Sequence, residues 1–405
     1  MRSRPPSPYV TMIKRQAQIE EVCGECRAQG RFAFDTEFVM EDRFEPEVCL
    51  VQIATESSVA VIDPFLDLDL RPVWELVCDE QVETVVHAGQ EDLGLCVQHA
   101  GKAPRRIYDV QMAAGFAGYD YPLSLQRLVQ ATLHFRIHKS KTLTDWRKRP
   151  LAPEQIQYGA EDVCYLLAVR QKLHERLSKW DRLDWLREEF SQLENISLYR
   201  QAEEEKLLRV KGAGALKGRQ LAVVRELLEW REAAAKGLNR PARAMLRDHL
   251  LVQIAKLELH SFDEIRALRG INLSDRHVRA LCRVVEKALK IPSDRWPTPA
   301  PRETETPKEQ ALISLATAVI RGYCLEHEMA YGLAASKKSI RELIGHCTRA
   351  HPPDRGDVEL LNGWRGRTVG AMLVELLAGR RAIRVESLQG ERLIRLIPFS
   401  ESPAT

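Results

Sequence analysis

The sequence predicts an α/β domain built on a mixed sheet, followed by one or two small all-α domains. Three observations support this fold class. Up to about residue 195, short β-rich runs alternate with helical stretches, which is the pattern of an α/β domain. From residue 200 onward only helical periodicity remains, and a proline-rich segment divides it in two. A chain of 405 residues that is 44% hydrophobic can build a core in each of two or three such domains.

The first strands are expected to form a hairpin-like meander, because charged or polar residues separate the β-rich runs. These runs are RFAFDTEF from residue 31, VCLVQIA at 48–54 and SVAVIDP at 58–64. Strands and helices then alternate, with a helix at about 67–79, a strand at 83–87, a helix at about 90–99, a strand at 105–110 and helices to about 195. A meander that continues into this alternation predicts a mixed sheet with helices on its faces.

The second half divides into helical segments around a linker. Residues 200–290 carry 20 Lys and Arg against 12 Asp and Glu, so they concentrate the basic surplus of a chain whose net charge is only +3. Five prolines between residues 291 and 308 exclude a regular helix and are typical of a semi-rigid linker. The predicted domains are therefore 1–200, 201–292, a linker at 293–308, 309–385 and a C-terminal tail at 386–405.

Composition narrows the classes of protein that remain. A net charge of +3 argues against a histone-like polycation, and no run approaches the roughly 18 apolar residues of a membrane span. The N-terminal segment has no apolar stretch typical of a secretory signal, so we expect a cytoplasmic protein. The nine cysteines form no regular framework and suit reduced thiols. We interpret the closely spaced Cys23 and Cys26 as helical cysteines instead of half a zinc site.

Asp35 and Glu37 are the first candidates for a functional site. They are two residues apart in a predicted strand and therefore point to the same face. Adjacent carboxylates repel each other unless a cation lies between them, and Mg²⁺ or Mn²⁺ prefers such hard oxygen ligands. A polar strand end that faces solvent is the alternative, and this spacing taken alone favours it.

Asp92 is the second candidate. In HAGQED it follows a strand and lies in the first turn of the next helix, the position at which α/β sheets present ligands. A carboxylate there also complements the helix dipole and the unpaired N–H groups, so a structural role explains Asp92 equally well. The same structural role explains the neighbouring Glu91, whose side chain we expect to face solvent.

Tyr158 and Asp162 are the third candidate. They are four residues apart in a predicted helix, so the phenol and the carboxylate share one face. A surface pair is the alternative. Taken together, the four carboxylates fit two-metal hydrolysis of a phosphodiester, which needs carboxylates that converge from different elements. Tyr158 adds a hydroxyl that can orient a water molecule.

These motifs resemble the three exonuclease motifs of the ribonuclease D family, in the tyrosine subgroup of the DEDD superfamily. The resemblance rests on FDTEF, HAGQED and YGAEDVCYLL preceded by TDWRKRPLAPEQIQ, and it covers about residues 8–200. It implies a ribonuclease H-like fold, 3′→5′ removal of nucleotides and two divalent cations, Mg²⁺ or Mn²⁺, with no organic cofactor. Gly159 and Glu161 stand where the family more often has alanines, but the Tyr-x3-Asp spacing is kept.

The resemblance also implies a role for each site residue. Asp35, Glu37 and Asp162 would hold the catalytic metal ion, and Asp35 would bridge to the second ion. Asp92 would support that second ion directly or through water, and Tyr158 would orient the attacking water.

Two basic regions are predicted to bind nucleic acid. Residues 215–290 resemble an HRDC domain, the nucleic-acid-binding helical module that follows the exonuclease domain in ribonuclease D, and their basic surplus, which includes Arg243, fits phosphate contacts. Basic residues between the second and third motifs form a candidate track for the RNA backbone: Lys139, Lys141, Arg147 and Arg149. Merely solvated basic surfaces are the alternative in both regions.

Region 309–385 weakly resembles the divergent second helical domain of the same family. Its Trp364 could stack on a base, but we expect this side chain in the core.

We therefore predict a metal-dependent 3′→5′ exoribonuclease that releases nucleoside 5′-monophosphates. It would trim the 3′ ends of structured or precursor RNA such as tRNA, as a monomer. Two alternatives stay open: a 3′→5′ deoxyribonuclease of the same superfamily, and a catalytically silent module that binds RNA. The presence of all four carboxylates and the tyrosine argues against the silent module.

Overall fold

The computed structural model describes residues 9–137, 145–200, 206–207, 209–298, 305–348, 355–388 and 393–399. Their contacts divide the chain into two compact units. The first consists of Met1–Thr36, Leu50–Ile196 and Glu305–Thr405, and the second of Glu37–Cys49 and Ser197–Thr304. Within the described part of the chain, no helix is long and apolar enough to cross a membrane.

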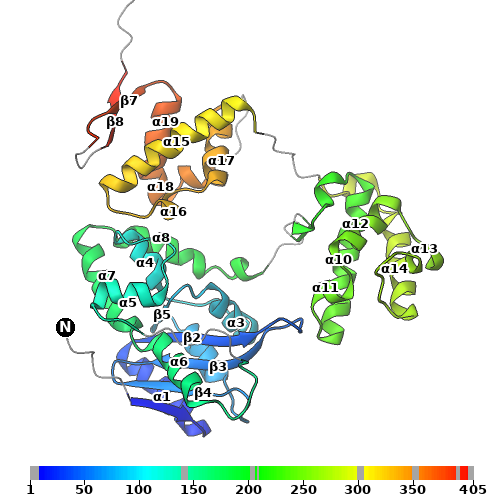
Figure 1. Ribbon diagram of the computed structural model, residues 1–405, viewed down its shortest axis with the longest axis horizontal. Helices are drawn as coiled ribbons and strands as arrows, with labels where there is room; N and C mark the ends of the chain where they lie inside the picture. The colour runs from blue at the N-terminus through cyan, green and yellow to red at the C-terminus, as the bar shows by residue number, and fades with distance from the viewer. Residues whose placement is uncertain are drawn as a thin grey trace, which may run out of the picture. The chain divides into compact units, whose positions relative to one another are not determined.

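A six-stranded mixed sheet in the order β1-β4-β3-β2-β5-β6 organises the exonuclease-like part of the chain (Figure 1). Its strands are β1 (Tyr9–Ile13), β2 (Arg31–Val39), β3 (Glu47–Ala54), β4 (Ser58–Ile62), β5 (Glu83–Val86) and β6 (Ile107–Asp109). β3 and β4 pair antiparallel, whereas β1 with β4, β2 with β5, and β5 with β6 pair parallel. The predicted mixed sheet is confirmed. β1, with the sequence YVTMI, was not predicted.

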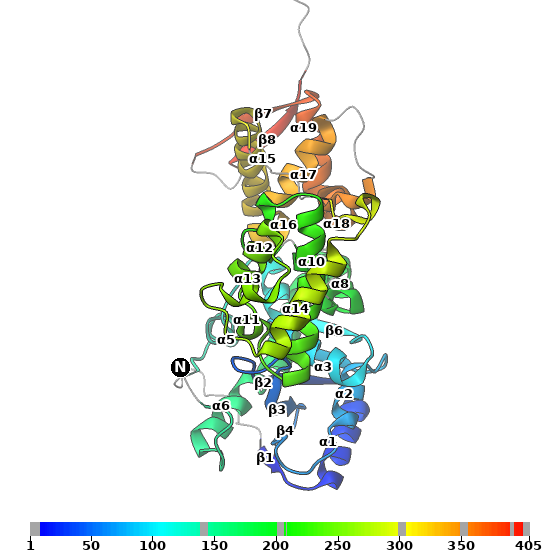
Figure 2. The same ribbon diagram turned by 90° about the vertical axis from the view of Figure 1, so that its right-hand side faces the viewer.

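Helices cover both faces of this sheet. They are α1 (Gln16–Gln29), α2 (Arg71–Val77), α3 (Gln90–Ala100), α4 (Val110–Phe116), α5 (Leu125–Leu133), α6 (Pro153–Val163), α7 (Leu166–Lys179) and α8 (Leu183–Leu193). α1 and α2 lie on one side of the strands and α6 on the other (Figure 2). This cover on both sides explains why β3 is buried along nearly its whole length and reads as an almost continuous apolar run.

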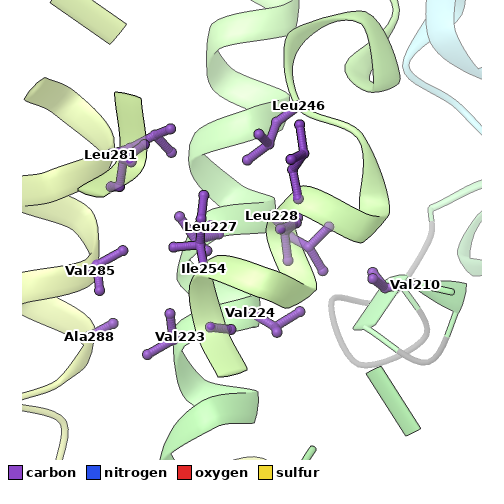
Figure 3. Packing of buried hydrophobic residues seen from close by; sticks show 14 of the residues in the cluster. Val210, Val223, Val224, Leu227, Leu228, Leu246, Ile254, Leu281, Val285 and Ala288 are labelled. Carbon is purple, nitrogen blue, oxygen red and sulfur yellow. The ribbon is translucent and has the colours of Figure 1, made fainter. Parts of the chain in front are cut away.

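The second unit is a helical bundle around one apolar core. Among the residues that the structure describes, its α-helices include α10 (Arg219–Leu238), α11 (Ala242–Met245), α12 (Asp248–Leu257), α13 (Phe262–Arg266) and α14 (Asp275–Ala288). Figure 3 shows Leu281, Val285 and Ala288 of α14 pointing toward residues of α10 and α12. The three side chains recur at helical spacing and, with Val278 and Cys282, form the buried face of α14.

The C-terminal part contains helices and, contrary to the expected all-α domain and tail, a β-hairpin. Its elements are α15 (Pro307–Glu326), α16 (Tyr331–Ala334), α17 (Lys337–Thr348), α18 (Gly363–Arg365), α19 (Ala371–Leu377), β7 (Arg381–Val385) and β8 (Ile394–Pro398). β7 and β8 pair antiparallel. Each of these strands has five residues, and arginines interrupt its apolar positions. A pattern this short does not distinguish a strand from the end of a helix.

This C-terminal part docks on α4 and α8 through an aromatic cluster. Trp364 is 1% exposed, stacks on Trp185 of α8 with ring centroids 5.0 Å apart, and meets Phe116 of α4 edge-on at 5.2 Å. Its indole N–H donates to Glu189 Oε1 at 2.6 Å. Trp364 is therefore a core residue, as predicted from the sequence.

Candidate active site

β2 directs its side chains alternately toward the two faces of the sheet. Phe34 packs edge-on against Trp74 of α2, with ring centroids 6.4 Å apart. Asp35 and Glu37 point to the opposite face, where they meet a carboxylate from α6. One continuous strand therefore presents both carboxylates on the side that the sequence pattern predicts.

α6 supplies Tyr158 and Asp162 one helical turn apart, and the Tyr158 hydroxyl forms a hydrogen bond with the Asp162 carboxylate. Gly159 lets this helix lie close to β3. A Cβ atom at Gly159 would be 2.8 Å from Nε2 of Gln52 and 2.9 Å from Cδ2 of Leu50. The glycine that departs from the usual alanine thus has a packing reason in this chain, because the buried Gln52 occupies the space of a methyl group.

Asp35, Glu37 and Asp162 form the carboxylate cluster, in which one oxygen of each lies within 4.8 Å of the others. The pKa of Asp162 is raised to about 7, first by burial and then by the negative charge of Glu161. The hydrogen bond from Tyr158 opposes this rise. Three converging carboxylates repel each other, so the cluster has the electrostatics of a divalent-cation site. Among the residues that the structure describes, it is the one group of three or more His, Cys, Asp or Glu side chains with this geometry.

Asp92 lies at the start of α3, and Thr36 holds it. Its Oδ1 accepts hydrogen bonds from the Thr36 backbone N–H, at 3.1 Å, and from the Thr36 hydroxyl. Burial raises the pKa of Asp92 to about 6, although the Thr36 bonds lower it. Asp92 is not one of the three residues of the carboxylate cluster, but its charge adds to the raised pKa of Asp162. Asp92 therefore interacts electrostatically with the carboxylate cluster, which contains the other three predicted carboxylates.

The predicted RNA track is described only in part. Lys139 and Lys141 lie outside the described residues. Arg147 of this track is half-buried. Arg243, the predicted RNA contact outside the track, lies in α11 and is exposed. Arg149 forms an ion pair with Asp63, with Nε 2.6 Å from Oδ2.

Three residues that contact a predicted site residue were not identified from the sequence: Thr36, Trp146 and Asp63. Thr36 is the partner of Asp92, and its position between Asp35 and Glu37 on the other face of a strand was the available signal. Trp146 has its ring centroid 5.9 Å from that of Tyr158, and Asp63 holds Arg149. No local pattern links Asp63 to the third motif, because the two segments are 86 residues apart.

Comparisons with known proteins agree with this geometry. A family model for the 3′-5′ exonuclease domain matches residues 10–178, and a model for the HRDC domain matches residues 220–284. The chain is 32% identical over 393 residues to a ribonuclease D of Granulibacter bethesdensis, a match that covers 96% of this chain and 97% of the relative. The chain belongs to the ribonuclease D family. A ribonuclease D of Pseudomonas paraeruginosa is also 32% identical, with 92% of this chain and 98% of the relative covered.

The crystal structure of Escherichia coli RNase D, described as an exoribonuclease involved in structured RNA processing, has the same fold. It superposes with a TM-score of 0.80 at 27% identity, covering 92% of this chain and 99% of that one. As a member of the ribonuclease D family, the protein is a hydrolytic 3′→5′ exoribonuclease, which confirms the predicted reaction class. The exonuclease and HRDC parts expected from the sequence are confirmed as well. Ribonuclease D enzymes use divalent metal ions, and the carboxylate cluster fits that requirement.

Proposed function

We propose that this ribonuclease D protein removes nucleoside 5′-monophosphates from the 3′ ends of structured or precursor RNA, tRNA precursors included. The observation that carries the proposal is the convergence of carboxylates from β2 and α6 within 4.8 Å, beside the Tyr158 hydroxyl. The proposed catalytic residues are Asp35, Glu37, Asp92, Tyr158 and Asp162. Action as a monomer in the cytoplasm belongs to the same proposal.

The donor set fits two divalent cations, Mg²⁺ or Mn²⁺, because every candidate ligand is a carboxylate oxygen. We assign Asp35, Glu37 and Asp162 to one ion, and Asp35 with Asp92 to the second. Thr36 engages Oδ1 of Asp92, so Asp92 would keep its other carboxylate oxygen for the second ion. When bound, the ions would lower the pKa of a water molecule and stabilise charge on the leaving 3′ oxygen.

Tyr158 has the geometry to orient the attacking water. A phenol hydroxyl can donate one hydrogen bond and accept others. Donation to Asp162 directs the proton of Tyr158 toward the carboxylate cluster. Its oxygen lone pairs can then accept a hydrogen bond from water and aim that water at the scissile phosphate.

RNA contacts are proposed for basic residues in two regions. Lys139, Lys141 and Arg147 lie close in sequence to the Tyr158 motif, and Arg243 lies on the exposed surface of the HRDC helices. Their contribution would be electrostatic and independent of base sequence, so RNA binding should weaken steeply with salt. Arg149 was expected in this group, but its guanidinium has partners within the protein.

A time course on single-stranded RNA labelled at either end, with Mg²⁺, Mn²⁺ or EDTA, tests the proposal. We expect metal-dependent shortening from the 3′ end with release of mononucleotides, and no shortening in EDTA. Matched DNA is the control for sugar preference, because the 2′-OH is the systematic difference. Intact RNA under every metal, or shortening of DNA alone, would contradict the proposed function.

A further inference from the structure

Arg149, in the turn that leads into α6, is anchored to the residue that follows β4. Its Nε donates to Oδ2 of Asp63 and its Nη2 donates to Oδ1, each at 2.6 Å. Asp63 is 5% exposed, and the ring of Phe65 covers the guanidinium, whose Cζ lies 4.4 Å from the ring centroid. A bidentate pair that is largely shielded from water holds one geometry, unlike an exposed ion pair.

The third guanidinium nitrogen binds backbone carbonyl oxygens of the same turn. Nη1 of Arg149 donates to the carbonyl oxygens of Trp146, at 2.7 Å, and Lys148, at 2.9 Å. Asp145 braces the other end, because its Oδ1 accepts from the Arg147 N–H at 3.1 Å. All three nitrogens of Arg149 therefore donate to protein oxygens, and the side chain ties the backbone of residues 145–149 to the end of β4.

The same turn presents Trp146 to Tyr158. The two ring centroids are 5.9 Å apart and the ring planes meet at 45°. The hydroxyl end of Tyr158 is held by Asp162. Tyr158 is thus constrained twice, at its ring by Trp146 and at its hydroxyl by the carboxylate.

We propose that Asp63 and Arg149 are positioning residues for hydrolysis: their ion pair holds the turn so that Trp146 keeps the Tyr158 hydroxyl aimed at the carboxylate cluster. This inference rests on the proposed function, in which Tyr158 orients the attacking water. A displacement of about 1 Å in an aligned group can lower a rate by about 10²-fold. An ion pair outside the carboxylate cluster can therefore control kcat without contacting RNA.

Direct contact between Arg149 and an RNA phosphate is the competing role, and substitution by lysine separates the two. Lysine keeps the positive charge that a phosphate contact needs. It lacks the planar fork of five N–H groups, so it cannot hold the Asp63 carboxylate and the Trp146 carbonyl together. The positioning role therefore predicts that Arg149→Lys fails, whereas the phosphate role predicts that it largely works.

The test compares Arg149→Lys, Asp63→Asn and the double variant with the wild-type chain in Mn²⁺-dependent cleavage of 3′-labelled RNA. We expect kcat to fall about 10- to 100-fold in each single variant, with KM and RNA affinity in EDTA within about twofold of wild type. The double variant should be no slower than the slower single variant, because both changes break one unit. Trp146→Phe should retain more activity than Trp146→Ala.

Arg71→Lys is the matched control. Arg71 also forks onto an aspartate, Asp69, but this pair is exposed and Arg71 is outside the proposed site. Wild-type kcat and KM are expected for it. Thermal unfolding of every variant shows whether a loss of activity comes from a loss of fold.

Two kinetic outcomes would overturn the proposal: weaker RNA binding with unchanged kcat in Arg149→Lys, or losses that add in the double variant. Hydrogen exchange over residues 145–162 gives a readout that does not depend on activity. Exchange must be faster in Asp63→Asn and Arg149→Lys than in wild type and Arg71→Lys, and equal rates would also overturn the proposal. If the wild-type chain leaves RNA intact with every metal, the proposed function is wrong. The hydrogen-exchange rates of the variants would then still test whether the Asp63–Arg149 ion pair holds the turn.

Discussion

At the scale of single residues, alternation along β2 organises the candidate site. Thr36 holds Asp92 through its backbone N–H and its hydroxyl, while Asp35 and Glu37 meet Asp162. A substitution at Asp35 should therefore remove a metal ligand without loosening Asp92. The residue that fixes Asp92 is therefore distinct from the residues of the carboxylate cluster.

Asp35→Asn is expected to lower kcat by about 10³-fold or more, because it removes the carboxylate proposed to contact both ions. RNA affinity in EDTA should stay close to wild type, since asparagine has nearly the same shape. Steady-state cleavage and a filter-binding titration measure the two quantities. Glu91→Gln, which changes an exposed neighbour of Asp92, is the control. Wild-type turnover in Asp35→Asn would remove Asp35 from the site.

The Arg231–Asp248 pair gives a prediction about pH. Burial is the largest single effect on Asp248 and raises its pKa, but the hydrogen bond from Arg231, at 2.7 Å, the charge of Arg231 and weaker contributions from Lys211 and Arg243 together outweigh burial and leave the pKa lowered. The pair therefore stabilises the helical unit above the unfolded pKa of about 3.9, and this stabilisation is lost as pH falls through the lower, folded pKa.

Asp248→Asn should reduce the free energy of unfolding of that unit by about 2 kcal/mol near neutral pH. The difference from wild type should shrink as the pH falls from about 6 to about 3. Urea unfolding of the full chain, monitored by hydrogen exchange in α10 and α12, measures this difference in unfolding free energy across the pH range. A difference that grows toward low pH would show that the ionised Asp248 is not the stabilising form.

At the scale of secondary-structure elements, the C-terminal helices are attached to the exonuclease helices by specific polar contacts as well as by apolar burial. Arg182, at the start of α8, donates through Nη1 to the last carbonyl of α4, Phe116, at 2.7 Å, and through Nη2 to the carbonyl of His327 at the end of α15. The N–H of Ala330 donates to the Gly115 carbonyl at 2.9 Å. Helix ends that would otherwise leave carbonyls unpaired are thus joined across the contact.

Trp364→Ala should destabilise this attachment by about 3–5 kcal/mol, because it leaves a cavity beside Trp185 and removes the indole N–H that donates to Glu189. Limited proteolysis and hydrogen exchange should show earlier opening of α15 to α19. Leu325→Ala, at a residue that is 66% exposed, should change stability by less than about 0.5 kcal/mol. Equal opening in both variants would mean that Trp364 does not hold the contact.

At the scale of the whole molecule, the chain carries its carboxylates and its basic surplus in different regions. The carboxylate cluster is built on β2 and α6, whereas residues 200–290 hold 20 basic against 12 acidic side chains. Cation binding and RNA binding should therefore respond to different changes in solution. We expect divalent ions to act on the carboxylate cluster and monovalent salt to act on the proposed phosphate contacts.

Mn²⁺ at about 100 times its Kd should stabilise the wild-type exonuclease domain by about 2.7 kcal/mol, and EDTA should reverse this gain. Differential scanning calorimetry with and without the ion measures it through Tm. The gain should be much smaller in Asp35→Asn, and α10 to α14 should keep the same hydrogen-exchange rates in both conditions. Equal stabilisation of wild type and Asp35→Asn would place the ion elsewhere.

The amino-acid pattern was enough to predict the local geometry of the candidate site and the family. The two-residue period of a strand places Asp35 and Glu37 on one face, and the helical period places Tyr158 and Asp162 one turn apart. These relations depend only on backbone geometry, so a pattern of residues is enough to predict them. The mixed sheet followed from the order of its elements for the same reason.

The distant residues that support this site became visible in the folded chain and could not be predicted from the pattern. Thr36 holds Asp92, Asp63 holds Arg149, and the C-terminal Trp364 stacks on Trp185. Each pair joins segments far apart in the chain, and the pairing of β7 with β8 escaped the pattern as well. Such contacts form because burial favours one packing of many compatible side chains, and no local period records which distant partner fills a given space.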